Sequence, residues 1–332
     1  MSESTATPRV GIIGLGGIGR THIAAWKANG ITPVAFSDTV PALLDAAIEA
    51  HGGTPYANAN DLIQSGAVDI VSVCTPPAFH ANLAIAALEA GVATICEKPL
   101  AANLADAERV QEAAGRTGTL FAVGFCHRFQ PHIEELKRRI DAGELGQIRT
   151  FRNRFAGLLA NAEKTWFSNP AISGGGALID TSVHSIDLFR HLIGDPVTVD
   201  ALMSTTETTL GPALPVEDTA ILILKTAEGT LGSIEASWRT PVGEWTVTLY
   251  GTKGTAVVDY GTNELRICPV AGGGEWETVA VPDGDRFQRE IADFIACWRG
   301  GDTPRATVAD GVAANRILDA AYRSAASSGT PV

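Results

Sequence analysis

Two groups of residues, far apart in the chain, carry side chains suited to acid–base chemistry. Lys98 lies within Glu97–Pro99, which follows a short apolar run. Asp180 and His184 come after Gly174–Gly176 and are four residues apart, so a helix would place them on one face. An ammonium can stabilise a developing alkoxide, and an imidazole exchanges protons near neutral pH. We therefore predict that Lys98, Asp180 and His184 form the catalytic group.

Each of these residues also has a simpler interpretation. Lys98 can form an ion pair with Glu97 at a strand end, and His184 can satisfy polar groups in a core. Asp180 can orient the imidazole or bind a substrate hydroxyl. Asp187 and His191 extend the polar series, but helical spacing cannot bring all four residues onto one ion. We therefore predict no metal site.

A glycine-rich segment near the N-terminus fits a dinucleotide. Gly14–Gly19 follows a short apolar run and precedes a helical pattern, the context that a G-x-G-x-x-G motif needs. Gly14 would permit the tight turn, Gly16 the approach of a pyrophosphate, and Gly19 the packing of helix on strand. The simpler alternative is a glycine-rich turn with a capping aspartate.

The cofactor preference rests on Asp38, 24 residues after Gly14. Its carboxylate would accept hydrogen bonds from ribose hydroxyls and repel a 2′-phosphate, so NAD is favoured over NADP. Thr75 and His80, beyond the next strand, could line the nicotinamide half, or could be a turn residue and a helix cap. The predicted cofactor-binding residues are Gly14, Gly16, Gly17, Ile18, Gly19, Asp38, Thr75, Pro76, His80, Glu97 and Lys98.

Further side chains are candidates for contact with a substrate. Arg128 follows the last strand of the first region, and Trp166 lies in a predicted lid where it could stack on a sugar face. Arg152 and Arg154 share one side of a strand, although a strand arginine is more often solvated or ion-paired. The predicted substrate-binding residues are Lys98, Arg128, Arg154, Trp166, Asp180 and His184.

The elements that must position these residues form two regions. Residues 1–126 alternate apolar strands with helices, which predicts an α/β domain with a doubly wound parallel sheet. The predicted strands are 9–14, 33–37, 68–74, 93–96 and 120–125, and the predicted helices are 18–29, 41–51, 79–90 and 104–116.

Residues 127–332 predict an α+β domain with a large, mostly antiparallel sheet, and its last helices could pack back on the first domain. Its predicted helices are 131–142, 176–192, 286–299 and 308–326, and its predicted strands are 148–155, 197–206, 218–226, 230–238, 245–250 and 255–260, with two shorter runs up to 282.

Composition narrows the class of partner. The chain has 25 Lys and Arg against 37 Asp and Glu, a net charge of −12, so we expect neither nucleic acid nor membrane as a partner. The polar N-terminus lacks the basic and apolar regions of a secretion signal, so we expect none, and the five cysteines form no C-x-x-C pair. We interpret them as buried thiols in a reducing cytoplasm, and the alternative is a structural disulfide.

The glycine fingerprint, Glu97–Pro99 and the glycine run leading to Asp180 and His184 resemble the glucose–fructose oxidoreductase/inositol dehydrogenase (Gfo/Idh/MocA) family. The resemblance covers nearly the whole chain, including Ala122–Phe129 and Ala321–Ser324. It implies an N-terminal Rossmann domain and a C-terminal domain with an open sheet that is often used for homodimer or homotetramer contacts.

The same resemblance implies residue roles. It makes Lys98 the catalytic lysine, His184 the acid/base and Asp180 its supporting acid, and it implies that the Lys98–Pro99 bond is often cis. It leaves the substrate open, because members act on inositols, hexoses, anhydrosugars, amino sugars and biliverdin-like molecules.

Three functional hypotheses follow. The first is an NAD-dependent dehydrogenase for a secondary alcohol of a sugar or polyol. The second keeps NAD tightly bound and modifies a sugar by oxidation, elimination and reduction. The third is a non-catalytic sensor of a dinucleotide, which would be expected to lack the lysine or the histidine.

Overall fold

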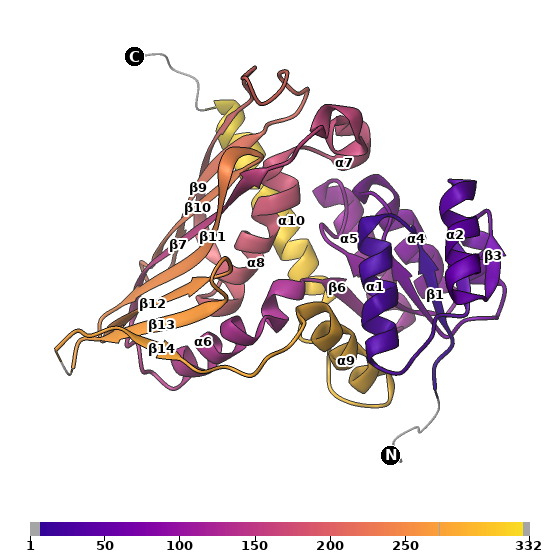
Figure 1. Cartoon of the computed structure of the whole chain (residues 1–332), viewed down its shortest axis with the longest axis horizontal. Helices are drawn as coiled ribbons and strands as arrows, with labels where there is room; N and C mark the ends of the chain where they lie inside the picture. Colours follow the sequence, from indigo (N-terminus) through magenta and orange to yellow (C-terminus); the bar gives the residue numbers. More distant parts are fainter. Residues whose placement is uncertain (1–6, 272, 328–332) are drawn as a thin grey trace. The chain divides into compact units, whose positions relative to one another are not determined.

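The computed structural model describes residues 7–271 and 273–327, so the polar segment at the N-terminus lies outside the described residues (Figure 1). Contacts divide the chain into two compact units, each with its own sheet. The first unit comprises residues 1–126 and 285–315, and the second comprises residues 127–284 and 316–332. The long helix α10 (Val308–Ser327) contributes residues to both units.

The first unit contains a six-stranded parallel sheet in the order β3-β2-β1-β4-β5-β6. Its strands are β1 (Val10–Ile13), β2 (Ala35–Ser37), β3 (Thr54–Tyr56), β4 (Ile70–Val73), β5 (Ala93–Glu97) and β6 (Phe121–Gly124). The strand order reverses direction between β1 and β4, and ligands of such sheets bind beyond the carboxyl ends of the strands at that point. This unit confirms the predicted doubly wound parallel sheet.

Helices cover both faces of this sheet. They are α1 (Gly17–Ala28), α2 (Pro41–His51), α3 (Ala59–Gln64), α4 (Pro77–Glu89), α5 (Leu104–Thr117) and α9 (Arg286–Trp298). Alternate strand residues such as Val10 and Ile12 join one apolar cluster with Trp26 of α1 and Phe294 of α9. On the opposite face, a Cβ at Gly11 would contact Leu62 of α3. The near-continuous apolar strands are therefore buried from two sides.

The second unit contains an eight-stranded sheet in the order β14-β13-β12-β11-β7-β10-β9-β8. Its strands are β7 (Ile148–Leu158), β8 (Pro196–Ser204), β9 (Thr219–Thr226), β10 (Leu231–Ser237), β11 (Arg239–Gly251), β12 (Gly254–Asp259), β13 (Glu264–Pro269) and β14 (Glu277–Val279). Only the β7–β10 pair among these ladders is parallel. The mostly antiparallel sheet is confirmed.

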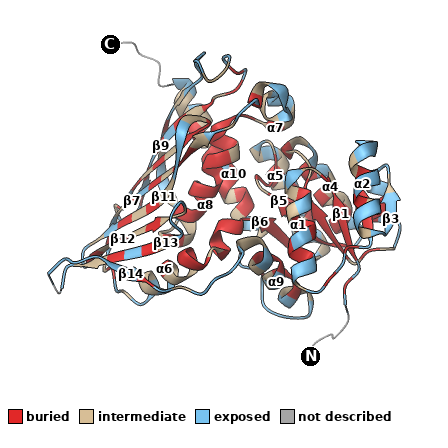
Figure 2. Ribbon diagram, in the orientation of Figure 1, coloured by how far each residue is buried: buried red, intermediate tan, exposed pale blue. Residues whose placement is uncertain are grey.

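The two faces of this second sheet differ. One face packs against helices α6 (Pro131–Asp141) and α8 (Val183–Leu192), where Phe151 meets Phe189 edge-on. Along β9, buried Leu222 and Leu224 alternate with exposed Ile221 and Ile223 (Figure 2). Strand alternation therefore leaves apolar side chains on the open face.

The predicted helix 176–192 is built in two parts. Leu178–Ser182 forms a π-helical turn, and the regular helix α8 begins at Val183. Such turns are rare and frequently occur at functional sites. Among the described residues, no helix is both long enough and apolar enough to cross a lipid bilayer. All five cysteines are free thiols, as predicted, but Cys268 and Cys297 are only half-buried.

Candidate active site

The first unit gathers the predicted cofactor residues at one edge of its sheet. Gly14 follows β1, Asp38 follows β2, Thr75 lies just beyond β4 and Lys98 follows β5. Because the four strands are parallel and adjacent, their carboxyl ends lie at the same edge. The residue types suited to a dinucleotide and to charge stabilisation are thus brought together within this unit.

Two glycines of the fingerprint are required by packing within the protein. Gly14 has φ +90°, and a Cβ there would lie 2.6 Å from the carbonyl oxygen of Cys74. A Cβ at Gly19 would lie 2.0 Å from the carbonyl oxygen of Gly14. A side chain at Gly14 would therefore clash with the backbone that follows β4, and one at Gly19 would push helix α1 away from the end of β1.

The other two glycines leave space that the protein does not fill. A Cβ at Gly16 or Gly17 would meet no protein atom within 4 Å, although α1 begins there with open N–H groups. Ile18 is partly exposed in the same first turn. Nearby, Thr75 Oγ1 is buried and has no hydrogen-bond partner among the described residues. An open helix N-terminus and an unpartnered hydroxyl fit a dinucleotide with a pyrophosphate.

Asp38 is held in place by the turns around it. Its Oδ2 accepts a hydrogen bond from the Leu15 N–H at 2.7 Å, and its Oδ1 accepts one from Val40 at 2.8 Å. The carboxylate is only half-buried, and each oxygen can accept more than one hydrogen bond. Asp38 is therefore fixed next to the glycine turn with capacity left for ribose hydroxyls.

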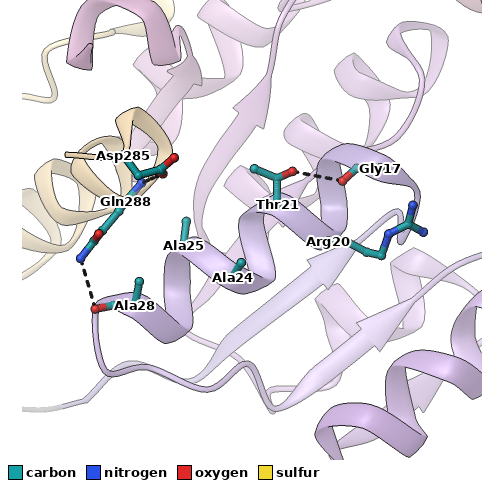
Figure 3. Close-up of a pocket in the computed structure, with 8 residues that line it drawn as sticks. All are labelled: Gly17, Arg20, Thr21, Ala24, Ala25, Ala28, Asp285 and Gln288. Atoms are coloured by element: carbon teal, nitrogen blue, oxygen red, sulfur yellow. Dashed lines mark hydrogen bonds between the residues drawn. The ribbon is translucent and has the colours of Figure 1, made fainter. Parts of the chain in front are cut away.

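A groove of about 480 Å³ runs along the outer side of α1 (Figure 3). Its walls include small residues of α1 and the start of α9, where Gln288 donates to the Ala28 carbonyl. Gly17 and Arg20 lie at its end near the start of α1. Of the predicted cofactor residues, only Gly17 belongs to this groove, so it is distinct from the strand-end site.

Glu97 organises the backbone on which Lys98 sits. Its Oε1 accepts from Nε2 of His22 at 3.0 Å, and its Oε2 accepts from the Lys98 N–H at 3.0 Å. The Lys98–Pro99 peptide is cis, as the resemblance implied. Glu97 is 4% exposed, which argues for a positioning role and against the predicted direct contact with the cofactor.

The buried pair of His22 and Glu97 gives a stability prediction. Burial alone raises the pKa of Glu97, but the hydrogen bond from His22 and the charge of Lys98 outweigh it, so the net pKa is lowered. A lowered folded-state pKa means that ionised Glu97 stabilises the fold above its unfolded pKa of about 4.5, and that this stability is lost as pH falls through the folded pKa. Glu97→Gln should lower the free energy of unfolding by about 3 kcal/mol at pH 7, with a smaller loss at acid pH.

Urea denaturation of both proteins across this pH range measures that difference. Glu89→Gln is the control, because Glu89 pairs with Arg116 at the surface and should contribute less than about 1 kcal/mol. A loss that does not change with pH would show that Glu97 acts through its shape and not through its charge.

His80 ties together the turns after β4 and β5. Its Nδ1 lies 2.8 Å from the Pro99 carbonyl oxygen, and its Nε2 lies 2.7 Å from that of Thr75. The side chain is 1% exposed, and burial lowers its pKa. Both nitrogens thus face backbone oxygens, which argues against the predicted contact between His80 and the nicotinamide. Pro76, the residue before α4, is half-buried at the same turn.

The second unit positions Asp180 and His184 on adjoining turns. Asp180 lies in the π-helical turn, and His184 lies in the first turn of α8 and is 9% exposed. The ring of His184 lies 4.4 Å from the ring of His127, whose Nδ1 is 2.9 Å from the Tyr260 hydroxyl. A second titratable ring therefore lies against the predicted acid/base.

Arg128 braces the same helix. Its Nε lies 2.9 Å from Asp187 Oδ2, and its Nη2 lies 2.6 Å from Oδ1, in a pair that is almost fully buried. Because this two-pronged ion pair joins the segment after β6 to α8, the geometry assigns Arg128 a structural role. Its predicted contact with a substrate stays a prediction.

The glycine run before Asp180 has an explanation that the sequence did not reveal. A Cβ at Gly175 would lie 1.9 Å from the Tyr322 hydroxyl, and one at Gly176 would lie 1.8 Å from the Glu217 carbonyl oxygen. Glu217 Oε1 also accepts from the Gly176 N–H and from Tyr322, each at 2.9 Å. A glycine run can allow a ligand to approach the backbone closely, but here packing of the protein against itself already accounts for Gly175 and Gly176.

Arg154 does not share a sheet face with the acid/base. On β7, Phe155 contacts His127 on the helix-covered face, so Arg154 projects to the open face. There it forms ion pairs with Glu235 and Glu244, at 3.0 and 2.5 Å. Its predicted contact with a substrate stays a prediction, and Arg152 shares that open face.

Trp166 remains a candidate for substrate contact. It lies in a 3₁₀ turn, Trp166–Ser168, and stacks on Phe167 with ring centroids 3.9 Å apart. It is 36% exposed, which leaves part of the indole accessible.

Sequence reasoning missed several residues around the site. His22 was not considered, although it follows the fingerprint by three residues on the buried face of α1. His127 was noted only within Ala122–Phe129, as part of the family resemblance. Glu217 carries no local signal, because its partners are Gly176, Leu178 and Tyr322.

Comparison with known proteins identifies the same two-part organisation. Residues 8–125 match the model of an oxidoreductase family with an NAD-binding Rossmann fold, and residues 133–257 match the GFO/IDH/MocA C-terminal domain. The chain is 31% identical to inositol 2-dehydrogenase of Rhizobium meliloti (strain 1021), with 96% of this chain and 97% of that protein covered. It is 29% identical to the rhizopine catabolism protein MocA of Rhizobium meliloti, with 94% and 93% covered.

Among solved structures, a levoglucosan dehydrogenase in complex with NADH and levoglucosan superimposes with a TM-score of 0.89. It is 28% identical, and the match covers 97% of this chain and 98% of that one. The strand-end cofactor residues, the two matched domains and the full-length relatives agree, and the chain belongs to the Gfo/Idh/MocA family of NAD-binding oxidoreductases.

Proposed function

We propose that this oxidoreductase transfers hydride between a nicotinamide and a secondary alcohol or ketone of a sugar or polyol. The relatives named for inositol and levoglucosan support that substrate class. Residues 1–126 would bind the dinucleotide, and residues 127–332 would bind the substrate and form oligomer contacts. The observation that carries the proposal is the gathering of Gly16, Asp38, Thr75 and Lys98 at the ends of parallel strands.

The residues of this chain would divide the reaction between them. When bound, NAD supplies the acceptor for the hydride that leaves the carbinol carbon. His184 takes the hydroxyl proton, and Lys98 stabilises the negative charge that develops on the same oxygen while the carbonyl forms. Asp180 holds the imidazole or a neighbouring substrate hydroxyl. Glu97 and His22 fix the backbone of Lys98 and take no part in proton transfer.

A substrate panel tests this proposal. Inositols, hexoses, anhydrosugars and their oxidised forms are incubated with NAD and with NADP in parallel, and reduction is followed by absorbance. We expect turnover with at least one polyol and a preference for NAD, because Asp38 repels a 2′-phosphate. Confirmed NAD binding without turnover of any compound would contradict the dehydrogenase. Reduced cofactor that forms once and stays bound would instead indicate an oxidation, elimination and reduction cycle.

We further propose that the protein is a homodimer or homotetramer, assembled through the open sheet face, in a reducing cytoplasm. The five free thiols support that compartment. On the open face, Leu202 of β8 is 62% exposed and pairs across the ladder with Ile221 of β9, which is 45% exposed. A contiguous row of exposed apolar side chains favours an interface between copies.

Leu202→Glu should therefore dissociate the oligomer, because it places a charge within the proposed apolar contact. Light scattering after gel filtration measures the mass of each protein. Val40→Glu, an exposed apolar position in the first unit, is the matched control and should leave the mass unchanged. A wild-type protein that is monomeric at micromolar concentration would overturn the proposed assembly.

A further inference from the structure

Asp180 is connected to a buried tryptophan by one hydroxyl group. Trp238 follows β10, is 5% exposed, and its indole Nε1 donates to Thr181 Oγ1 at 3.0 Å. Thr181, which is 6% exposed, lies next to Asp180 in the π-helical turn, and its hydroxyl donates to Asp180 Oδ2 at 3.3 Å. We refer to this chain of Trp238, Thr181 and Asp180 as the relay.

The chemistry of the three groups fixes the direction of the relay. An indole N–H can only donate, and an ionised carboxylate can only accept. The threonine hydroxyl has one hydrogen and accepts from Trp238, so that hydrogen is left for Asp180. The relay therefore restricts the rotation of the Thr181 hydroxyl and presents its hydrogen to the carboxylate.

The indole is itself held rigidly. The backbone N–H of Trp238 donates to the carbonyl oxygen of Asp218 at 2.8 Å, and the backbone carbonyl of Trp238 accepts from the N–H of Leu159 at 3.0 Å. The indole ring meets Phe167 edge-on at 5.9 Å, within a small apolar cluster that includes Val216. The donor at the start of the relay is thus fixed by backbone on two sides and by packing on its face.

The same ring also supports the segment that carries Trp166. Phe167 packs against Trp238 and stacks on Trp166, the candidate for contact with a sugar. One buried indole therefore anchors both the 3₁₀ turn of Trp166 and the carboxylate of Asp180.

We propose that Trp238 and Thr181 are positioning residues that set the orientation of Asp180 and link it to the turn bearing Trp166. This proposal rests on the proposed function, in which Asp180 supports His184 or binds a substrate hydroxyl. Trp238 and Thr181 act only through Asp180, and neither residue takes part in the transfer of the proton or the hydride.

Four variants test the relay through catalysis. Trp238→Phe keeps the packing against Phe167 and removes the N–H, and Thr181→Val keeps the shape and removes the hydroxyl. Each should lower kcat/KM for the polyol by about tenfold and leave the dissociation constant of NAD unchanged, because the hydrogen bond to the Asp180 carboxylate is removed in Thr181→Val and is no longer held in one direction in Trp238→Phe. Thr181→Ser keeps the hydroxyl and should restore most of the activity. The double variant should lose no more than Thr181→Val alone, because both changes break one chain.

Trp26→Phe is the matched control. Trp26 is also buried, and its indole donates to the Ser72 hydroxyl at 2.9 Å, in the core of the first unit. It should lose stability comparable to Trp238→Phe and keep kcat/KM. An equal loss of kcat/KM in Trp26→Phe, or additive losses in the double variant, would overturn the relay.

A spectroscopic measurement separates the relay from the proposed function. The indole ¹H–¹⁵N signal of Trp238, assigned by its loss in Trp238→Phe, should shift in Asp180→Asn and in Thr181→Val, whereas the signal of Trp26 should not. This result requires no turnover, so it holds even if the substrate panel fails. If the Trp238 signal did not shift in Asp180→Asn, the relay would be overturned, and the proposed dehydrogenase function would be unaffected.

Discussion

Replacing Lys98 with Met is expected to lower kcat by about 10²–10³, the effect of removing one charge-stabilising donor from a developing oxyanion. Met has nearly the length of Lys and carries no charge, so it keeps the packing of the half-buried stem. The backbone of Lys98 should stay in place, because its N–H is bonded to Glu97 and not to the side chain that changes. NAD should still bind within about tenfold of the wild-type affinity, since at most one hydrogen bond to the cofactor is lost.

Steady-state kinetics with the best polyol of the panel, together with calorimetric titration of NAD, measures both quantities. Lys27→Met is the matched control, because Lys27 is an exposed lysine in the last turn of α1. Turnover close to that of the wild type would remove Lys98 from the chemistry. Loss of NAD binding together with turnover would make it a cofactor residue alone.

The first sheet was predictable because its strands are short, nearly continuous apolar runs that alternate with helical patterns, which is typical of a parallel sheet covered on both faces. The exception is β3, which was missed. Thr54–Tyr56 is three residues long, contains a proline and is largely exposed, so it lacks the apolar pattern of the other strands. Its pairing with β2 alone gives it strand character.

The contacts that sequence reasoning did not foresee involve partners distant in sequence. The glycines before Asp180 resemble a loop that admits a ligand, but Glu217 and Tyr322 occupy the space that their side chains would need. Strand alternation showed that Arg152 and Arg154 share one side, yet only the position of α8 decides which side faces His184. The local pattern thus predicted which residues group together, and tertiary packing decided what they face.

The positioning residues follow the same logic. Lys98 was recognisable from its motif. Its support by His22 was not, because it depends on a hydrogen bond between His22 and the Glu97 carboxylate, 75 residues away in the chain. Asp180 was recognisable from its spacing to His184. Its link to Trp238 was not, because it runs through the hydroxyl of Thr181, which is 57 residues from Trp238 in the chain. Residues that carry chemistry leave short signatures in a sequence, and residues that orient them are found by their contacts.

His184→Gln is expected to lower kcat by about 10²–10⁴, the usual contribution of a positioned general base. Glutamine can occupy the space of the imidazole and form hydrogen bonds, but it cannot accept the hydroxyl proton. In the direction of alcohol oxidation, a base must be deprotonated before it acts, so kcat/KM of the wild type should rise with pH through the titration of His184. The variant should lose that rise and depend on pH only through other groups.

The pH profile of kcat/KM also decides whether His184 or the neighbouring His127 accepts the proton. The control is a third histidine: His191→Gln, two turns further along α8, should keep both the rate and the rise with pH. His127 lies with its ring 4.4 Å from that of His184, so a charge on one ring opposes a charge on the other. His127→Gln should therefore displace the rise without abolishing it. If His184→Gln retained the rise and His127→Gln removed it, the proton acceptor would be His127, and Asp180 would lose its assigned role as the supporting acid.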